Sequence, residues 1–252
     1  MPIRSRILLV DDDPSMLETM KDVLSTRGYQ MDTARSGPEA LTRAAEKKFQ
    51  FIIVDLQAMA PAEVEAVRQL GRLQPGVPVL LPTAGQSPAE SAAARIAGVI
   101  PVHKPLEFGP LLRFIEQTLR PARVLMIDDD KKLTTMLGRF LTREGFETVV
   151  ASDFEQGKKA LVDQAPDAVL LAVHLPDRSG LDLLEVCRKS KLHPLIIIST
   201  GFRKQFQGQV ERALKTQAYV CLEKPYQPSE LVAALRRGLQ EKMVVALQTG
   251  AK

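Results

Sequence analysis

The stretch ILLVDDD, from Ile7 to Asp13, is a run of apolar β-formers that ends in three aspartates, and VLMIDDD, from Val124 to Asp130, repeats it. Such an apolar run is typical of a strand buried on both faces of a parallel sheet. The acids would then lie at the strand's carboxyl end, where open α/β sheets bind ligands. Because two unit charges about 4 Å apart repel by roughly 4 kcal/mol at an effective dielectric of about 20, the cluster predicts a hard cation such as Mg²⁺. The alternative is a solvated loop in which Asp13 or Pro14 starts a helix.

Length and composition predict a soluble globular protein. The chain has 252 residues, of which 45% are hydrophobic and 25% charged, which is ordinary for a globular protein of two domains. No apolar run is long enough to span a membrane, and the N-terminus MPIRSR lacks the apolar core of a signal peptide, so we expect a cytoplasmic protein with no membrane partner. The two cysteines have no metal-site spacing, which predicts buried free thiols.

The net charge of +4 is dispersed. Residues 1–120 carry 14 basic and 14 acidic side chains, and residues 121–252 carry 20 and 16. This balance predicts a solvated surface and no nucleic-acid partner.

Self-comparison shows that the chain contains two copies of one domain. Asp12 and Asp129 are 117 residues apart, as are Thr83 and Thr200, and the Lys-Pro pair at 104–105 recurs 120 residues later. We therefore expect domains at 1–120 and 121–242. The tail at 243–252 either extends the last helix or frays.

Each copy alternates strand and helix signals five times, which predicts an α/β fold of two (βα)5 domains with parallel sheets and right-handed crossovers. In the first copy the expected strands are 6–10, 30–34, 51–54, 77–81 and 99–102, and the expected helices are 14–26, 38–47, 61–73, 88–96 and 107–119. In the second copy the expected strands are 123–127, 148–151, 168–173, 195–199 and 219–222, and the expected helices are 131–144, 154–163, 180–189, 205–215 and 228–240.

Chemistry-bearing side chains end several strands of the first copy. Asp55 ends one strand, Thr83 ends the next, and Lys104 follows the last, so all three should converge on Asp11 and Asp12. A hard cation, an acidic nucleophile, a hydroxyl and a lysine can together stabilise a phosphoryl group during transfer. Singly, these residues are ordinary as a helix cap, a strand-end hydroxyl and a surface charge. Their combination favours phosphoryl chemistry.

These residues resemble those of the receiver domain of bacterial two-component response regulators, a flavodoxin-like family that includes the chemotaxis response regulator. The resemblance covers about 5–119 and 122–240 and implies the strand order 2-1-3-4-5. In the first copy it implies an Mg²⁺ site and a phosphoacceptor, with these roles: Asp11, Asp12 and Asp55 as metal ligands with the carbonyl of Gln57, Asp55 as phosphoacceptor, Thr83 as hydrogen-bond partner of the phosphoryl group, and Lys104 as its cation.

The second copy departs from this family pattern at one decisive position. In VLLAVHLPDRSG, Pro176 fixes the alignment and puts Ala172 where the phosphoacceptor stands, 117 residues after Asp55. A methyl group cannot accept a phosphoryl group, so this site is predicted to be degenerate. The alanine is either natural or an engineered substitution. Four other site residues remain, namely the metal-binding Asp128 and Asp129 together with Thr200 and Lys224.

The first copy has departures of its own. Its loop after Asp55 lacks the family's proline and the glycine that opens the next helix. Pro101 and, in the second copy, Cys221 hold the place of the aromatic residue that moves inward on phosphorylation. These substitutions call the usual threonine–aromatic switch into question in both copies.

We therefore expect an output-less response regulator rather than an enzyme that turns over an external substrate. The first domain would accept a phosphoryl group on Asp55 from a sensor histidine kinase or histidine-phosphotransfer protein, and the second would serve docking or dimerisation. Output would pass to a downstream protein partner. The short linker 120–122 predicts domain packing in cis and leaves homodimer formation open. The alternatives are a phosphate sink or relay intermediate, and a receiver pair from a longer enzyme such as a nucleotide cyclase.

Overall fold

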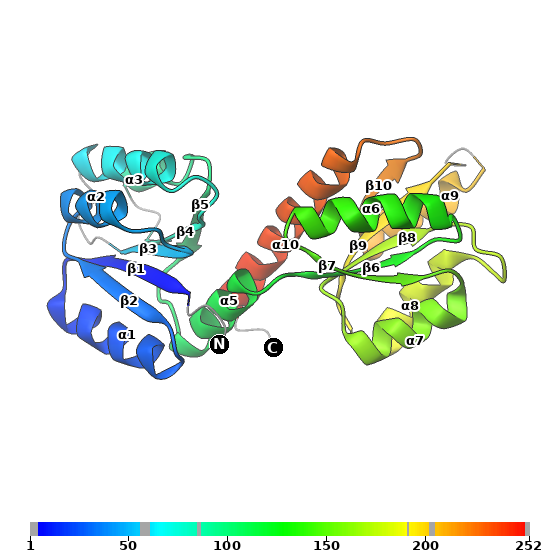
Figure 1. The fold of residues 1–252 in the computed structure, drawn as a ribbon, viewed down its shortest axis with the longest axis horizontal. Coiled ribbons are helices and arrows are strands. Elements are labelled where there is room, and N and C mark those ends of the chain that lie inside the picture. The colour runs from blue at the N-terminus through cyan, green and yellow to red at the C-terminus, as the bar shows by residue number, and fades with distance from the viewer. Residues whose placement is uncertain (1–4, 56–60, 85–86, 191, 202–204, 250–252) are drawn as a thin grey trace. The chain divides into compact units, whose positions relative to one another are not determined.

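The computed structural model describes residues 5–55, 61–84, 87–190, 192–201 and 205–249. The chain divides into two compact units, residues 1–119 with 244–252 and residues 120–243. Each unit contains one five-stranded parallel sheet (Figure 1).

The first unit has the strand order β2-β1-β3-β4-β5. Its strands are β1 (Arg6–Asp11), β2 (Gln30–Ala34), β3 (Phe51–Asp55), β4 (Val79–Thr83) and β5 (Val99–His103), and its helices are α1 (Pro14–Thr26), α2 (Gly37–Glu46), α3 (Pro61–Leu73), α4 (Pro88–Ala93) and α5 (Phe108–Leu119).

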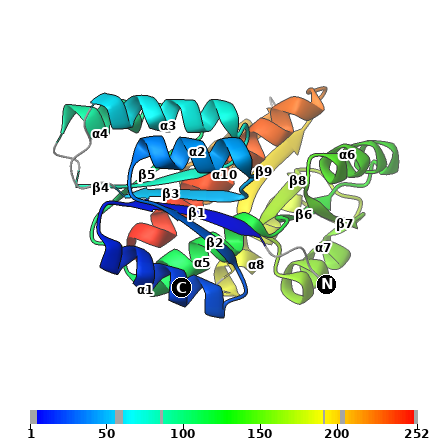
Figure 2. The same ribbon diagram turned by 60° about the vertical axis from the view of Figure 1, so that its left-hand side comes forward.

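This sheet is buried on both faces, as its apolar strands predict. Residues 7–10 of β1 are fully inaccessible to water. Leu8 and Val10 pack in one cluster with α2, α3 and α4, while α1 and α5 cover the opposite face (Figures 1 and 2). Phe51 of β3 meets Phe114 of α5 edge to face, with ring centroids 6.0 Å apart. The two helical layers therefore leave the strand ends as the exposed edge.

Two elements of the first unit differ from their predicted bounds. Strand β4 begins at Val79 rather than Val77, because the Val77 amide bonds the Gln74 carbonyl in a turn (3.2 Å). Helix α4 ends at Ala93 rather than at residue 96. There the amides of Arg95 and Ile96 turn to carbonyls three residues back, which tightens the last turn.

The second unit repeats the topology in the order β10-β9-β8-β6-β7. Its strands are β6 (Arg123–Ile127), β7 (Glu147–Ala151), β8 (Ala168–Ala172), β9 (Leu195–Thr200) and β10 (Ala218–Glu223). Its helices are α6 (Lys131–Arg143), α7 (Phe154–Gln164), α8 (Leu183–Lys189) after a 3₁₀ turn at Gly180–Asp182, α9 (Gln207–Thr216) and α10 (Pro228–Thr249).

Helix α10 is longer than the expected 228–240. It continues through the segment EKMVVALQT to Thr249, which contains no glycine or proline to stop a helix. Buried residues of α6 and α10 pack on one face of the second sheet. Helices α7, α8 and α9 pack on the other face.

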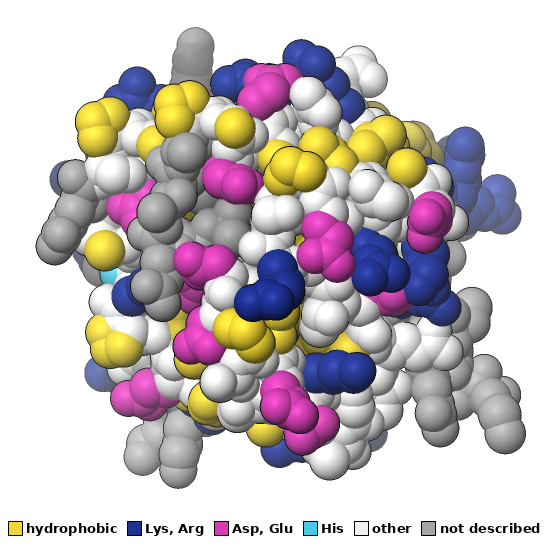
Figure 3. Space-filling view, turned by 90° about the vertical axis from the view of Figure 1, so that its left-hand side faces the viewer, with side chains coloured by type: hydrophobic (Ala, Val, Ile, Leu, Met, Phe, Trp, Pro, Cys, Tyr) yellow, Lys and Arg dark blue, Asp and Glu magenta, His cyan; other side chains and the backbone are white. Residues whose placement is uncertain are grey.

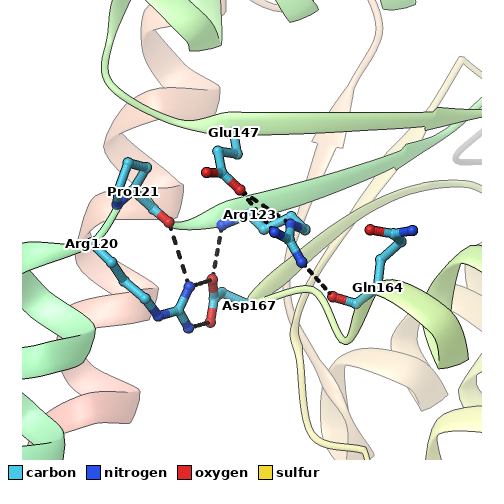
Figure 4. Close-up of polar contacts among 6 residues, drawn as sticks. All are labelled: Arg120, Pro121, Arg123, Glu147, Gln164 and Asp167. Atoms are coloured by element: carbon cyan, nitrogen blue, oxygen red, sulfur yellow. Dashed lines mark hydrogen bonds and ion pairs between the residues drawn. The ribbon is translucent and has the colours of Figure 1, made fainter. Parts of the chain in front are cut away.

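A network of charged side chains ties the first residues of the second unit to its sheet (Figure 4). The Asp167 carboxylate accepts two hydrogen bonds from the Arg120 guanidinium, at 2.8 and 2.5 Å, and a third from the Arg123 amide at 2.8 Å. Arg123 in turn donates to Glu147 and to the Gln164 carbonyl. These contacts fix the segment that enters β6.

The surface carries charge of both signs. In the face drawn in Figure 3, acidic and basic side chains are interspersed. Among the described residues, no helix combines the length and apolar character that crossing a bilayer requires. The expected buried thiols are found at Cys187 only, because Cys221 is half-buried.

Candidate functional site

The predicted site of the first unit lies at the carboxyl edge of its sheet, where four strands bring their last residues together. Asp11 ends β1 and is the direct register partner of Asp55, which ends β3. Thr83 ends β4 and is buried. The Lys104 amide donates to the Thr83 carbonyl at 3.0 Å, which fixes the turn that carries the lysine.

Asp55 and Lys104 form an ion pair across this edge. The lysine Nζ lies 2.5 Å from Asp55 Oδ1. That oxygen is buried, and within the described residues no hydrogen-bond donor satisfies it, so the ammonium group holds it by charge. An oxygen in this state retains lone pairs for a further electrophile or cation.

The environment of Asp11 disfavours its charged form. It is 4% exposed, and its Oδ1 accepts the Asp13 amide at 2.8 Å. Burial, opposed by that hydrogen bond and reinforced by the charges of Asp55, Asp12 and Asp13, raises the pKa of Asp11 to about 6. The single ammonium of Lys104 therefore leaves negative charge uncompensated.

A pocket of about 500 Å³ adjoins these acids, and its apolar wall was not predicted from the sequence. Met16 and Met20 come from α1, and Leu106, Phe108 and Leu111 from the region that follows β5. Met16 and Phe108 are 40% and 41% exposed. The signal available in the sequence was their spacing: Met16 and Met20 share one helical face, and Leu106 and Phe108 follow the Lys-Pro pair at 104–105.

At the corresponding edge of the second unit, the lysine pairs with a different acid. Lys224 pairs with Asp128, its Nζ lying 2.5 Å from Oδ2, because the counterpart of Asp55 is the buried methyl group of Ala172. The backbone is nonetheless the same, since the Lys224 amide donates to the Thr200 carbonyl at 2.9 Å. Lys224 thus supplies an internal cation to an acid predicted to bind metal.

Close packing at Gly180 fixes the loop that follows Ala172. A Cβ on Gly180 would lie 1.9 Å from the Ala172 carbonyl oxygen, so only glycine fits there. The first unit has Glu63 at the equivalent position, and its carboxylate accepts the Gly37 amide at 2.9 Å. That contact joins the first turn of α3 to the start of α2.

A polar pair behind the second site was also not predicted. The Ser199 hydroxyl, fully buried, donates to the Tyr226 hydroxyl at 3.2 Å. Burial raises the pKa of Tyr226. The only sequence signal for this pair was the position of Tyr226 two residues beyond Lys224.

Comparison with known proteins identifies the family to which both units belong. The family described as the response regulator receiver domain matches twice, over residues 7–116 and 124–236. The chain belongs to this family. Residues 1–119 therefore contain receiver 1 and residues 120–243 contain receiver 2.

Two curated relatives illustrate the match. The chain is 36% identical over 118 residues to the DNA-binding response regulator MtrA of Mycobacterium tuberculosis, covering 47% of this chain and 50% of that protein. It is 34% identical over 116 residues to the transcriptional regulatory protein CpxR of Escherichia coli, covering 45% and 47%. The chain spans about half the length of the curated relatives it matches.

A solved receiver domain, the CheY-like response regulator receiver protein from Methanospirillum hungatei, is 27% identical with a TM-score of 0.45 and covers 48% of this chain and 98% of its own.

Receiver domains generally bind Mg²⁺ at the phosphorylation site. Within the described residues, no group of three His, Cys, Asp or Glu side chains forms a preformed metal cage. Mg²⁺ does not need one, because it usually keeps several waters and takes one or two carboxylates. The buried Asp11, with its raised pKa, and the unsatisfied oxygen of Asp55 are donors of that kind, so receiver 1 fits the ion.

The remaining predicted residues are distributed as follows. Asp12 and Asp129 are exposed beside their buried neighbours, and Thr200 is buried at the end of β9. Gln57 lies outside the described residues. At the switch position Pro101 is exposed and Cys221 is half-buried, so neither receiver carries an aromatic ring there.

Proposed function

We propose that receiver 1 accepts a phosphoryl group on Asp55 from a histidine kinase or a histidine-phosphotransfer protein, in a response regulator whose output is protein–protein contact. The observation that carries this proposal is the pairing of Asp55 with Lys104 beside a buried acid with a raised pKa. This arrangement holds a nucleophilic carboxylate next to the cation that a phosphoryl group needs.

The transfer follows from the residues present. A carboxylate oxygen of Asp55 attacks the phosphorus of a phosphohistidine, the P–N bond breaks, and the imidazole leaves with the electron pair. Lys104 then pairs with a phosphoryl oxygen in place of the carboxylate, and the Thr83 hydroxyl would donate a hydrogen bond to another. Asp11, Asp12 and Asp55 would hold Mg²⁺, which when bound supplies positive charge to the phosphoryl oxygens. Water later hydrolyses the acyl phosphate.

Receiver 2 takes no part in this chemistry in our proposal. The methyl group of Ala172 has no lone pair, and Lys224 is already neutralised by Asp128. We infer a docking or dimerisation role for receiver 2. Relatives named as DNA-binding or transcriptional regulators match this chain over about half of their own length. We propose protein contact as the output because receiver 2 takes no part in phosphoryl transfer and keeps the surface of a folded receiver.

A phosphorylation assay tests the proposal. With Mg²⁺ and acetyl phosphate, the chain should gain one base-labile phosphoryl group, detected by intact-mass spectrometry. Asp55→Asn should gain none. Ala172→Asp is the matched gain-of-function variant and should gain a second group, because Asp128, Thr200 and Lys224 are in place. Stoichiometric phosphorylation of Asp55→Asn would overturn the assignment.

The direction of phosphoryl transfer distinguishes this proposal from the alternative of a sink or relay intermediate. Incubation of the phosphorylated chain with a histidine-phosphotransfer protein should leave the phosphoryl group on receiver 1 if the chain acts through protein contact. Rapid back-transfer would instead support a sink or relay intermediate.

A further inference from the structure

Helix α6 of receiver 2 lines an open groove whose charged side chains are all basic. The groove has a volume of about 660 Å³ and lies between α6 and the start of α10 at Pro228. Four cations line it, Lys131, Lys132, Arg139 and Arg143, together with Met136 and Phe140.

None of these four cations belongs to an ion pair in the described part of the chain, whereas Arg123 and Arg236 of the same receiver are paired with Glu147 and Glu144. Lys132 acts through its charge on Asp130, the residue that caps the start of α6. Lys131 and Lys132 also occupy the first turn of α6, which carries no acid. The helix dipole disfavours positive charge at that end, so helix stability does not explain their placement.

Receiver 1 provides an internal comparison. The equivalent helix α1 carries Glu18, Lys21 and Asp22, a net charge of −1, while α6 carries four cations and no acid. Both helices have 13 residues and start at equivalent positions in the two sheets. The fold therefore does not require these four cations. The positive stripe that they form on α6 (Lys131, Lys132, Arg139 and Arg143) is a property of receiver 2.

Apolar surface lies within the same stripe. Met136 is 49% exposed and Phe140, four residues on, is half-buried, so the two side chains are neighbours on one helical face. Lys132 precedes Met136 by one turn and Arg139 follows it by three residues. Basic side chains thus flank an apolar centre.

We propose that this groove binds an acidic amphipathic helix of a partner protein, whose apolar residues contact Met136 and Phe140 and whose carboxylates pair with the flanking cations. A helix laid in a groove presents anchors at spacings of three and four residues, which matches the spacing on α6. This gives a chemical identity to the docking role proposed for receiver 2. It rests on that role but not on phosphorylation of Asp55.

The size and content of the stripe favour a protein over nucleic acid. Lys131 and Arg143 are twelve residues apart, about 18 Å along a helix, and four cations in that length with an apolar centre are few for a polyanion that commonly engages about six to ten phosphates. The adjoining α10 residues are not all available, since Arg236 is paired with Glu144.

The test uses the full chain and a labelled 16-residue acidic peptide with leucine at every third or fourth position, measured by fluorescence anisotropy at 50 and 200 mM salt. Arg139→Glu/Arg143→Glu should raise the Kd about tenfold or more and reduce its salt dependence. The matched control is Arg212→Glu/Lys215→Glu on α9, which reverses two exposed charges of the same receiver and should leave the Kd within about twofold of the unaltered chain. Circular dichroism verifies that both variants fold.

Two further measurements separate the groove from simple charge attraction. A peptide of equal charge with serine in place of leucine should bind about tenfold more weakly, and Met136→Ser should weaken only the leucine peptide. Equal binding of both peptides, or equal losses in both double variants, would overturn the proposal. Tighter binding of a DNA duplex of equal charge to the groove, or a concentration-dependent dimer that Arg139→Glu/Arg143→Glu abolishes, would overturn the partner class. None of these readouts depends on Asp55, and Asp55→Asn should bind the peptide unchanged.

Discussion

Replacing Asp167 by alanine should destabilise receiver 2 by about 2–3 kcal/mol. The carboxylate accepts the Arg123 amide at 2.8 Å and both terminal nitrogens of Arg120 (Figure 4). A hydrogen bond to a charged group contributes about 1.5–3 kcal/mol. The ion pair adds less than about 1 kcal/mol, because the Arg120 side chain is 48% exposed and screened by water. The Arg123 amide would lose its charged partner at the entrance to β6.

Two milder variants calibrate this value. Arg120→Ala leaves the hydrogen bond to the Arg123 amide and should cost less than about 1 kcal/mol. Glu147→Ala removes an exposed partner of Arg123, whose contact is 3.0 Å long, and should cost a similar small amount. The order of losses therefore distinguishes the backbone hydrogen bond from the two ion pairs.

The assay exploits the positions of the two thiols. Both cysteines lie in receiver 2, and Cys187 is buried, so in a Cys221→Ser background pulsed thiol labelling across a urea series reports unfolding of that receiver alone. This matters because a two-domain chain need not unfold in one step. At a slope of about 1–3 kcal/mol per molar urea, Asp167→Ala should lower the midpoint by roughly 1 M or more. A midpoint equal to that of Glu147→Ala would refute the reasoning.

Three further predictions concern metal, packing and pH. The chain should bind Mn²⁺ most tightly in receiver 1. Calorimetry should find this binding lost in Asp11→Asn and kept in Asp128→Asn, because the Asp128 carboxylate is already paired with Lys224. The reverse pattern would contradict the site assignment. Gly180→Ala should destabilise receiver 2 by about 2 kcal/mol or more, because the added Cβ would lie 1.9 Å from the Ala172 carbonyl oxygen. The control is Gly208→Ala, whose added Cβ would meet no atom within 4 Å, so that variant should be neutral or stabilising. Urea titration measures both. Burial raises the pKa of Cys187 from 9.0 to about 11, so the folded state holds a proton that the unfolded state releases between these values. Stability should therefore fall as pH rises from about 9 to 11, by up to roughly 3 kcal/mol, and the fall should be smaller in Cys187→Ala; an identical pH profile in that variant would exclude the thiol as its cause.

Local patterns in the sequence were sufficient to predict the strand and helix order of both receivers. Strand β6 and helices α1 and α3 have the predicted bounds, because an apolar run, or a proline at the first position of a helix, acts through neighbours in the chain. The site residues were also predictable at strand ends, since parallel strands deliver their carboxyl ends to one edge of the sheet. Asp11 and Asp55 are register partners for this reason.

Contacts between distant residues were decided only by the tertiary structure. Lys104 pairs with an acid 49 residues away and Lys224 with one 96 residues away, and nothing local to either lysine shows that Ala172 redirects the second one. The cations of α6 were visible in the sequence, but their common groove with Met136 and Phe140 required the helix to pack beside α10. Periodicity is encoded over a few residues, whereas the partner of a side chain depends on which segments the closed core brings together.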